Sequence, residues 1–154
     1  MKVFVIYDSK YGNTKIAAEN ILEGIKQVEG IEATIGQVKE VDVQRLFSYD
    51  TLILGAPNHM ASPSRTMKQF VEKLAKLDLK AKYVAVFGTY SGRERNPDRA
   101  VKKMEKIMEK SLPNLKLLSP SLSIKVKGVT GPLAEGESNK CIAFGKRIAT
   151  QLKT

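Results

Sequence analysis

Short apolar runs alternate with helical stripes of apolar residues along the whole chain, and this alternation limits the folds that the chain can adopt. Residues 3 to 7, Val-Phe-Val-Ile-Tyr, form a continuous β-branched and aromatic run, which is typical of a strand covered on both faces. Further strands are predicted over residues 31–38, 51–56 and 83–87, and a fifth within 115–126 that breaks near Pro120.

Helices are predicted between these strands, because apolar residues recur there at helical spacing. The stripes run from the turn at 9–13 to Gly30, from Ser64 to Leu77, from Pro97 to Met108 and over about 135–152. Residues 43–50 stay unassigned. Parallel strands need crossover connections, so this order predicts an α/β fold with helices on both faces of a parallel sheet. In such sheets ligands bind beyond the carboxyl ends of the strands.

The length of 154 residues suits one domain, predicted over residues 1–154. The first residues read as a buried strand rather than a secretory leader, and no apolar run is long enough to span a membrane, so a cytoplasmic location is expected. The single cysteine, Cys141, excludes an internal disulfide and a cysteine-based metal cluster.

The chain is strongly basic, with 26 Lys and Arg against 16 Asp and Glu and a formal net charge of +10. Such a charge suits a nucleic acid, an anionic partner or an anionic ligand. The cations are spread along the whole sequence, mostly beside acids at helical spacing, as in residues 99–110. A solvated surface is therefore favoured over a nucleic-acid surface, which should show a clustered stripe and a recognisable module.

The loop after the first strand, Ser9-Lys10-Tyr11-Gly12-Asn13-Thr14, runs straight into a helix. Hydroxyl groups, an amide side chain and the free N–H groups of a helix start converge there, which suits a phosphate. An ordinary capped turn explains the same residues equally well. The loop is neither the glycine-rich dinucleotide fingerprint nor the Walker loop, so a dinucleotide or a nucleoside triphosphate is not the natural ligand.

This loop resembles the FMN phosphate loop of flavodoxins and the wider flavodoxin-like family. The similarity extends to residues 49–57, which look like that family's third strand and second flavin loop, and to residues 87–92, which look like its third flavin loop. The resemblance covers nearly the whole chain. It implies a three-layer sandwich with a five-stranded sheet in the order 2-1-3-4-5, FMN as the cofactor, and electron transfer as the function.

The resemblance also implies which residues contact FMN. The phosphate would be held by Ser9, Lys10 (through its backbone), Tyr11, Gly12, Asn13 and Thr14. The flavin ring would be enclosed by Pro57, Asn58, His59, Met60, Ala61, Gly88, Thr89, Tyr90, Ser91 and Gly92. Tyr90 is the candidate to stack on the ring. The chain departs from many flavodoxins in having no tryptophan at all and no glycine between Pro57 and Arg65.

Neither the single histidine nor the single cysteine is predicted to be catalytic. His59 has no obvious partner for acid–base chemistry nearby in the sequence, so a ring contact or a surface position is favoured. Cys141 falls on the apolar stripe of the last helix and is expected in the core. No metal site is predicted.

The leading functional hypothesis is an electron carrier that passes electrons between redox partner proteins. The first alternative is an FMN-dependent NAD(P)H:quinone or nitro-compound reductase, and the second is a basic nucleic-acid-binding module without flavin. The three loops and their flanks carry seven cations against three acids, a net charge of +4. Partners with acidic docking surfaces are therefore expected.

Overall fold

The predicted strands form one parallel sheet in the computed structural model, which describes residues 1–154. They are β1 (Lys2–Tyr7), β2 (Glu32–Gln37), β3 (Thr51–Pro57), β4 (Tyr83–Ser91), β5 (Lys116–Leu117) and β6 (Leu122–Val126). The sheet has the order β2-β1-β3-β4-β5, and β6 also pairs with β4. The predicted fold class and strand order are therefore confirmed.

The last strand is interrupted where the sequence predicted a break. β5 pairs with the start of β4 and β6 with its end, so the two pieces follow one line along the edge of the sheet. Pro120 lies between them and has no N–H group to donate to a ladder. The guanidinium of Arg147 donates to the carbonyl oxygens of Ser119 (3.0 Å) and Pro120 (2.6 Å), which supplies partners for backbone groups at the break.

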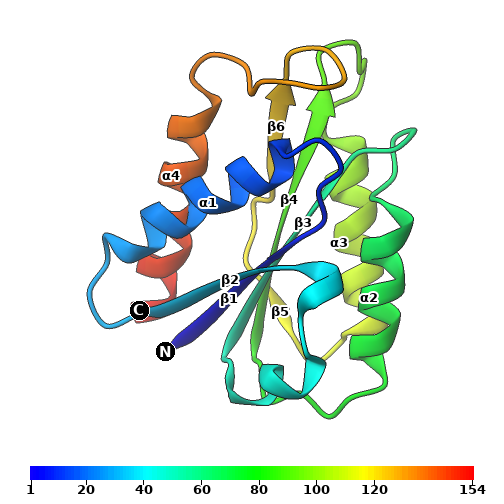
Figure 1. Ribbon diagram of the computed structural model, residues 1–154. Coiled ribbons are helices and arrows are strands. Elements are labelled where there is room, and N and C mark those ends of the chain that lie inside the picture. Colours follow the sequence, from blue (N-terminus) through cyan, green and yellow to red (C-terminus); the bar gives the residue numbers. More distant parts are fainter.

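Four long helices cover the sheet, as Figure 1 shows. They are α1 (Asn13–Lys26), α2 (Arg65–Ala75), α3 (Arg99–Ser111) and α4 (Glu137–Lys153). α1 and α4 lie on one face, and α2 and α3 lie on the other. None of them combines the length and the apolar content that a membrane-spanning helix needs.

The predicted helix starts are close but not all correct. Ser64 caps α2, because its side chain accepts a hydrogen bond from the N–H of Met67. α3 begins two residues later than predicted from Pro97, with Asp98 as its cap. The segment left unassigned, residues 43–50, contains a 3₁₀ helix over Val43–Ser48, whose start is capped by the carboxylate of Asp42. A shorter 3₁₀ helix covers Val38–Glu40, directly after β2.

The core forms two layers, because successive strand residues point to opposite faces of the sheet. In β1, Val3 and Val5 belong to the cluster under α1 and α4, whereas Phe4 and Ile6 belong to the cluster under α2 and α3. Burial on both faces explains why the strands read as continuous apolar runs rather than as alternating ones. Cys141 is fully buried in the layer under α4, as expected.

The helices α1 and α4 cross at two glycines. A Cβ atom added to Gly24 would collide with the backbone carbonyl oxygen of Ile142, and one added to Gly145 would collide with that of Ile21. The backbones of the first and last helices are therefore in direct contact, which no residue with a side chain would allow.

Replacing Gly145 by alanine should lower the free energy of unfolding by about 1–3 kcal/mol, the usual cost of overpacking. This loss would occur even though alanine favours a helix by about 1 kcal/mol over glycine. Urea unfolding measures the change. Asn139→Ala, at an exposed position of the same helix, is the control and should leave stability equal or slightly higher. A Gly145→Ala protein as stable as the wild type would contradict the close crossing.

Candidate functional site

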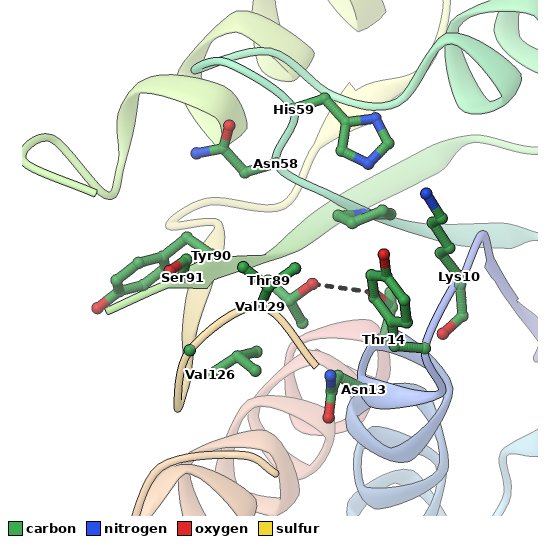
Figure 2. A pocket seen from close by; sticks show the side chains of 14 residues that line it. Lys10, Asn13, Thr14, Asn58, His59, Thr89, Tyr90, Ser91, Val126 and Val129 are labelled. Atoms are coloured by element: carbon green, nitrogen blue, oxygen red, sulfur yellow. Dashed lines mark hydrogen bonds between the residues drawn. The ribbon is translucent and has the colours of Figure 1, made fainter. Parts of the chain in front are cut away.

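Four loops at the carboxyl edge of the sheet enclose a cavity of about 220 Å³ (Figure 2). Residues from the loop after β1 and the start of α1, from the ends of β3, β4 and β6, and from the loops after β3 and β6 line it: Ser9, Lys10, Tyr11, Asn13, Thr14, Pro57, Asn58, His59, Thr89, Tyr90, Ser91, Val126, Gly128 and Val129. The parallel register brings these strand ends together, because Pro57 lies opposite Thr89 and Ser91 opposite Val126. Most of the predicted cofactor residues thus share one cavity.

The first wall is the loop that turns into α1. Gly12 caps this helix with a φ of 90°, a conformation that glycine adopts without strain. Its N–H donates to the side-chain oxygen of Ser9 (3.1 Å), which closes the turn. Gly12 has no side chain to cap the helix, and the first N–H that pairs with a carbonyl of this turn is that of Ile16. The N–H groups of residues 13–15 are therefore free to bind an anion, which also meets the positive end of the helix dipole.

A buried hydrogen bond joins this wall to the end of β4. The hydroxyl groups of Thr14 and Thr89, which lie 75 residues apart in the sequence, are 2.9 Å apart (Figure 2). Asn13 precedes Thr14, and its side chain is nearly buried against Gly131, where a Cβ atom would collide with the amide. Two polar side chains are thus held at the start of α1, beside the free N–H groups.

The second wall is a tight hairpin. The N–H of His59 donates to the carbonyl of Ser62 (2.7 Å), and the N–H of Ser62 donates to the carbonyl of His59 (3.1 Å). Asn58 and Pro63 form an antiparallel β-bridge. The two residues at the tip, Met60 and Ala61, have φ angles of 54° and 63°. Such turns normally use asparagine and glycine there, so this turn holds about 1–2 kcal/mol of backbone strain per residue. Only the base of the hairpin lines the cavity.

The third wall is the carboxyl end of β4, Thr89 to Ser91. The N–H of Asn58 donates to the carbonyl of Thr89 (2.8 Å), and the amide of Asn58 reaches Glu94 (3.5 Å). The side-chain oxygen of Asn58 is buried without a hydrogen-bond partner and belongs to a residue that lines the cavity. Tyr90 is half-buried. Tyr90 and Lys10 both line the cavity and lie on opposite sides of the group of residues in Figure 2. An aromatic ring and an unpaired acceptor therefore border the same space.

Some predicted residues lie outside the cavity lining, although they belong to the same loops. Gly12 and Gly92 shape turns, and the N–H of Gly92 donates to the carbonyl of Val126 (3.0 Å). Gly88 lies under Val101, where an added Cβ atom would be 3.0 Å from that side chain. The hairpin tip, Met60 and Ala61, faces a separate hollow beside α3.

The sequence analysis missed the fourth wall, which follows β6. Val126, Gly128 and Val129 line the cavity from this loop. The loop folds back on itself, because the N–H of Lys127 donates to the carbonyl of Pro132 (2.8 Å). Two glycines, Gly128 and Gly131, directly after the last strand were the available signal, since every parallel strand ends at the same edge.

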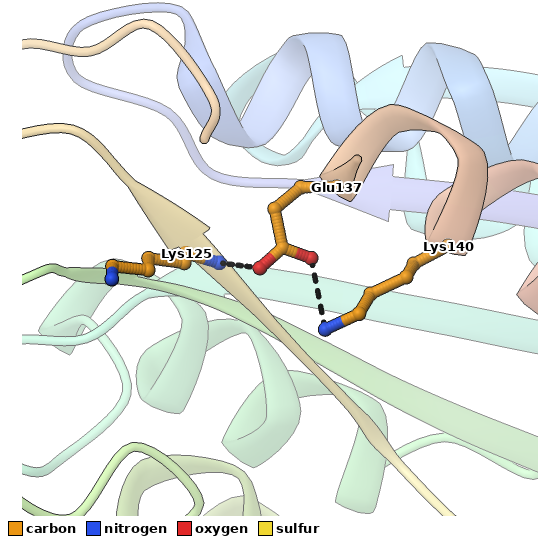
Figure 3. A network of polar contacts seen from close by, with 3 residues as sticks. All are labelled: Lys125, Glu137 and Lys140. Atoms are coloured by element: carbon orange, nitrogen blue, oxygen red, sulfur yellow. Dashed lines mark hydrogen bonds and ion pairs between the residues drawn. The ribbon is translucent and has the colours of Figure 1, made fainter. Parts of the chain in front are cut away.

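A buried carboxylate ties the start of α4 to β6, the strand that leads into the fourth wall (Figure 3). Glu137, in the first turn of α4, accepts a hydrogen bond from the N–H of Lys125 (3.2 Å) and pairs with the ammonium of Lys140 (3.1 Å). Lys125 lies opposite Tyr90 in the sheet register. Burial, followed by the charge of Glu137, raises the pKa of the Tyr90 hydroxyl. The same two causes raise the pKa of the Cys141 thiol to about 12, which suits an unreactive core residue.

The arrangement defines a class: an open parallel α/β protein with an anion-binding loop at the point where the strand order reverses. The family described as "Flavodoxin domain" matches residues 4–122, so the chain belongs to the flavodoxin family. It is an FMN-binding electron-transfer protein of that family. Flavodoxin is itself a standard example of this strand order and its ligand site.

Similar proteins agree with this assignment. A flavodoxin from Clostridium saccharobutylicum is 27% identical over 158 residues, which cover 99% of this chain and 98% of that protein. A solved flavodoxin from the domain Archaea has a TM-score of 0.83 at 24% identity, with complete coverage of both chains. An NAD(P)H dehydrogenase (quinone) from Geotalea daltonii is 29% identical over 113 residues, but these cover only 58% of this chain and 55% of that protein. The reductase alternative is therefore not favoured.

Replacing Glu137 by glutamine should lower the pKa of Tyr90, because a neutral amide keeps the acceptor for Lys125 and removes the nearby negative charge. Burial, the larger cause, should still hold this pKa above its ordinary value of 10.0. NMR of carbon-labelled tyrosine follows the titration, with Tyr90→Phe identifying the signal. Glu135→Gln, an exposed acid just before α4, should leave it unchanged. If the pKa of Tyr90 is the same in Glu137→Gln as in the wild type, the charge of Glu137 does not affect the Tyr90 hydroxyl.

Proposed function

We propose that this flavodoxin binds the phosphate of FMN at the start of α1, encloses the flavin ring between the loops after β3 and β4, and carries electrons between protein partners. The observation that carries this proposal is the set of unpaired N–H groups of residues 13–15. They lie beside a cavity at the point where the strand order of the sheet reverses. These donors suit a phosphate dianion, which needs several hydrogen bonds and positive potential.

Each residue of the phosphate loop has a distinct task in this proposal. Ser9 holds the turn closed and so fixes the direction of the N–H groups. Asn13 and Thr14 bring polar side chains to the phosphate, and Thr89 orients the Thr14 hydroxyl from the opposite loop. Lys10 adds its backbone and a positive charge. Such charge-assisted contacts contribute on the order of 1.5–3 kcal/mol each, so they dominate the affinity.

The ring would lie farther out, between the base of the hairpin and Tyr90. Bound FMN supplies one-electron and two-electron redox chemistry, which no side chain of the protein can supply. Tyr90 excludes water from one face of the ring, and the unpaired oxygen of Asn58 is placed to accept a hydrogen bond from a donor in the cavity. His59 contacts the ring edge as a neighbour rather than as an acid or base.

Acidic partner proteins fit the charge of this molecule. The net charge of +10 attracts an acidic protein over long range and repels a basic one, and the attraction weakens as salt screens it. The match to a flavodoxin over 99% of this chain and 98% of that protein supports a carrier. The cytoplasmic location stays a prediction from the sequence.

Replacing Asn13 or Thr14 by alanine should raise the Kd of FMN about tenfold or more, because each change removes a donor to the phosphate. Riboflavin lacks that phosphate, so its Kd should change by less than about threefold. Fluorescence titration of the apoprotein measures both ligands. Asn20→Ala, farther along α1, is the matched control and should affect neither. Equal losses for FMN and riboflavin would remove the phosphate from this loop.

Replacing Tyr90 by alanine should brighten the fluorescence of bound FMN and weaken its binding by about 0.5–1.5 kcal/mol beyond lost burial, because the stacked ring would be gone. His59→Ala, on the opposite wall, should change both properties less. Fluorescence yield and titration of the two variants make the comparison. A spectrally silent Tyr90→Ala beside an altered His59→Ala would place the stacking residue on the hairpin instead.

A further inference from the structure

A hollow of about 490 Å³ lies beside the cofactor cavity, between the hairpin tip and α3. Four cations and no acids line it, together with three uncharged residues: Arg99, Lys102, Lys103, Lys106, Met60, Ala61 and Asn96. The single ion pair of the molecule joins Lys140 to Glu137, so all four cations of this hollow are unpaired. We name these four cations and Met60 the α3 basic surface.

The four cations of α3 share one face of the helix. Residues 99, 102, 103 and 106 follow the i, i+3, i+4, i+7 spacing of one helical face, which extends about 10 Å along the axis. Met104 and Met108 are buried on the opposite face, against the sheet. Glu105 and Glu109 lie at the edge of this face: Glu105 is three residues after Lys102 and Glu109 three residues after Lys106, and neither acid forms an ion pair with them. The face that lines the hollow carries cations alone, with two acids beside it.

Met60 stands at the end of this surface as an isolated apolar side chain. It is 99% exposed, which is rare for a large apolar residue, and its backbone has a positive φ of 54°. The two backbone hydrogen bonds between His59 and Ser62 hold the turn in this conformation. Methionine adapts its shape to different apolar partners and is enriched in protein interfaces.

The α3 basic surface adjoins the cofactor cavity through the hairpin. The same hairpin that exposes Met60 lines the cavity with Asn58 and His59. The amide of Asn58 reaches Glu94 in the loop that leads into α3 (3.5 Å), so the hairpin and this loop are tied together. A protein seated on this surface would lie next to the flavin, where an electron has a short distance to travel.

We propose that the α3 basic surface is the docking site of an acidic redox partner, which rests on the proposed function of electron carrier. The partner presents a row of carboxylates to the four cations and an apolar patch to Met60. The cations speed encounter and set orientation, and the buried methionine slows dissociation. The phosphate backbone of a nucleic acid would pair with the four cations but has no apolar group to contact Met60. An acidic protein with an apolar patch therefore fits better.

The test measures electron transfer from the reduced, FMN-loaded full chain to a small acidic haem protein by stopped flow. Lys102→Glu/Lys106→Glu changes the docking surface, and Lys26→Glu/Lys153→Glu makes the same change of net charge at exposed sites of α1 and α4 that lie at the far end of the sheet. At low salt the first pair should slow transfer about tenfold or more and flatten its salt dependence, whereas the control pair should slow it by less than about threefold.

Met60→Asn tests the apolar tip without removing the turn, because asparagine tolerates a positive φ. It should slow transfer to the acidic haem protein severalfold at high salt, where the charges are screened. Transfer to benzoquinone, a small neutral acceptor, reports whether the flavin is intact. Both charge-reversal pairs should reduce it at the wild-type rate, and the haem-protein rate of Met60→Asn is compared with the benzoquinone rate of the same variant.

The outcomes separate the two proposals. A chain that binds no FMN, or that reduces neither acceptor, would overturn the proposed function. Normal reduction of benzoquinone with equal slowing of the haem protein by both charge reversals would overturn the docking site, since net charge alone would then explain the rates. Faster transfer to a basic haem protein than to the acidic one, or loss of single-stranded RNA binding by Lys102→Glu/Lys106→Glu with unchanged transfer to the acidic protein, would overturn it as well.

Discussion

The parallel hydrogen bonding of β1 between β2 and β3 is the constraint on which the rest of the structure depends. Since all strands run the same way, every loop that leaves a carboxyl end meets the others at one edge. The chain moves from β1 outward to β2 and then returns to β3, so the loops after β1 and β3 diverge to opposite faces. The cavity opens in the gap that this divergence leaves, and α1 directs its N-terminus into it.

Much of the fold was predictable because burial on both faces gives each strand an unbroken apolar run. The break at Pro120 was predictable for a local reason, a missing donor. The 3₁₀ helix at Val43–Ser48 was not, since its short turns follow from capping by Asp42 and from packing of Leu46 rather than from a period in the sequence. The hydrogen bond between Glu137 and the N–H of Lys125 could not be predicted either. An acid in the first turn of a helix is already explained by the helix dipole, so nothing in the sequence points to a second partner.

The candidate site was predictable in its loops but not in its details. The phosphate loop has a local pattern, so residues 9–14 could be named from the sequence. Met60 and Ala61 carry no turn signal, since a two-residue hairpin of this kind favours asparagine and glycine. Their backbone conformation places them over α3 instead of over the cavity. The loop after β6 has no local sequence pattern that marks a ligand site. It lines the cavity because all parallel strands end at the same edge of the sheet.

The crossing of α1 and α4 at Gly24 and Gly145 also orders events during synthesis. A ribosome releases α1 early, yet the face that carries Gly24 has no partner until the segment around Gly145 has emerged, about 120 residues later. Contacts between such distant segments form late, because the intervening chain must first be ordered. A nascent chain that stalls before α4 would therefore expose the side of α1 that α4 covers, and chaperones that recognise apolar surfaces would meet it at this stage.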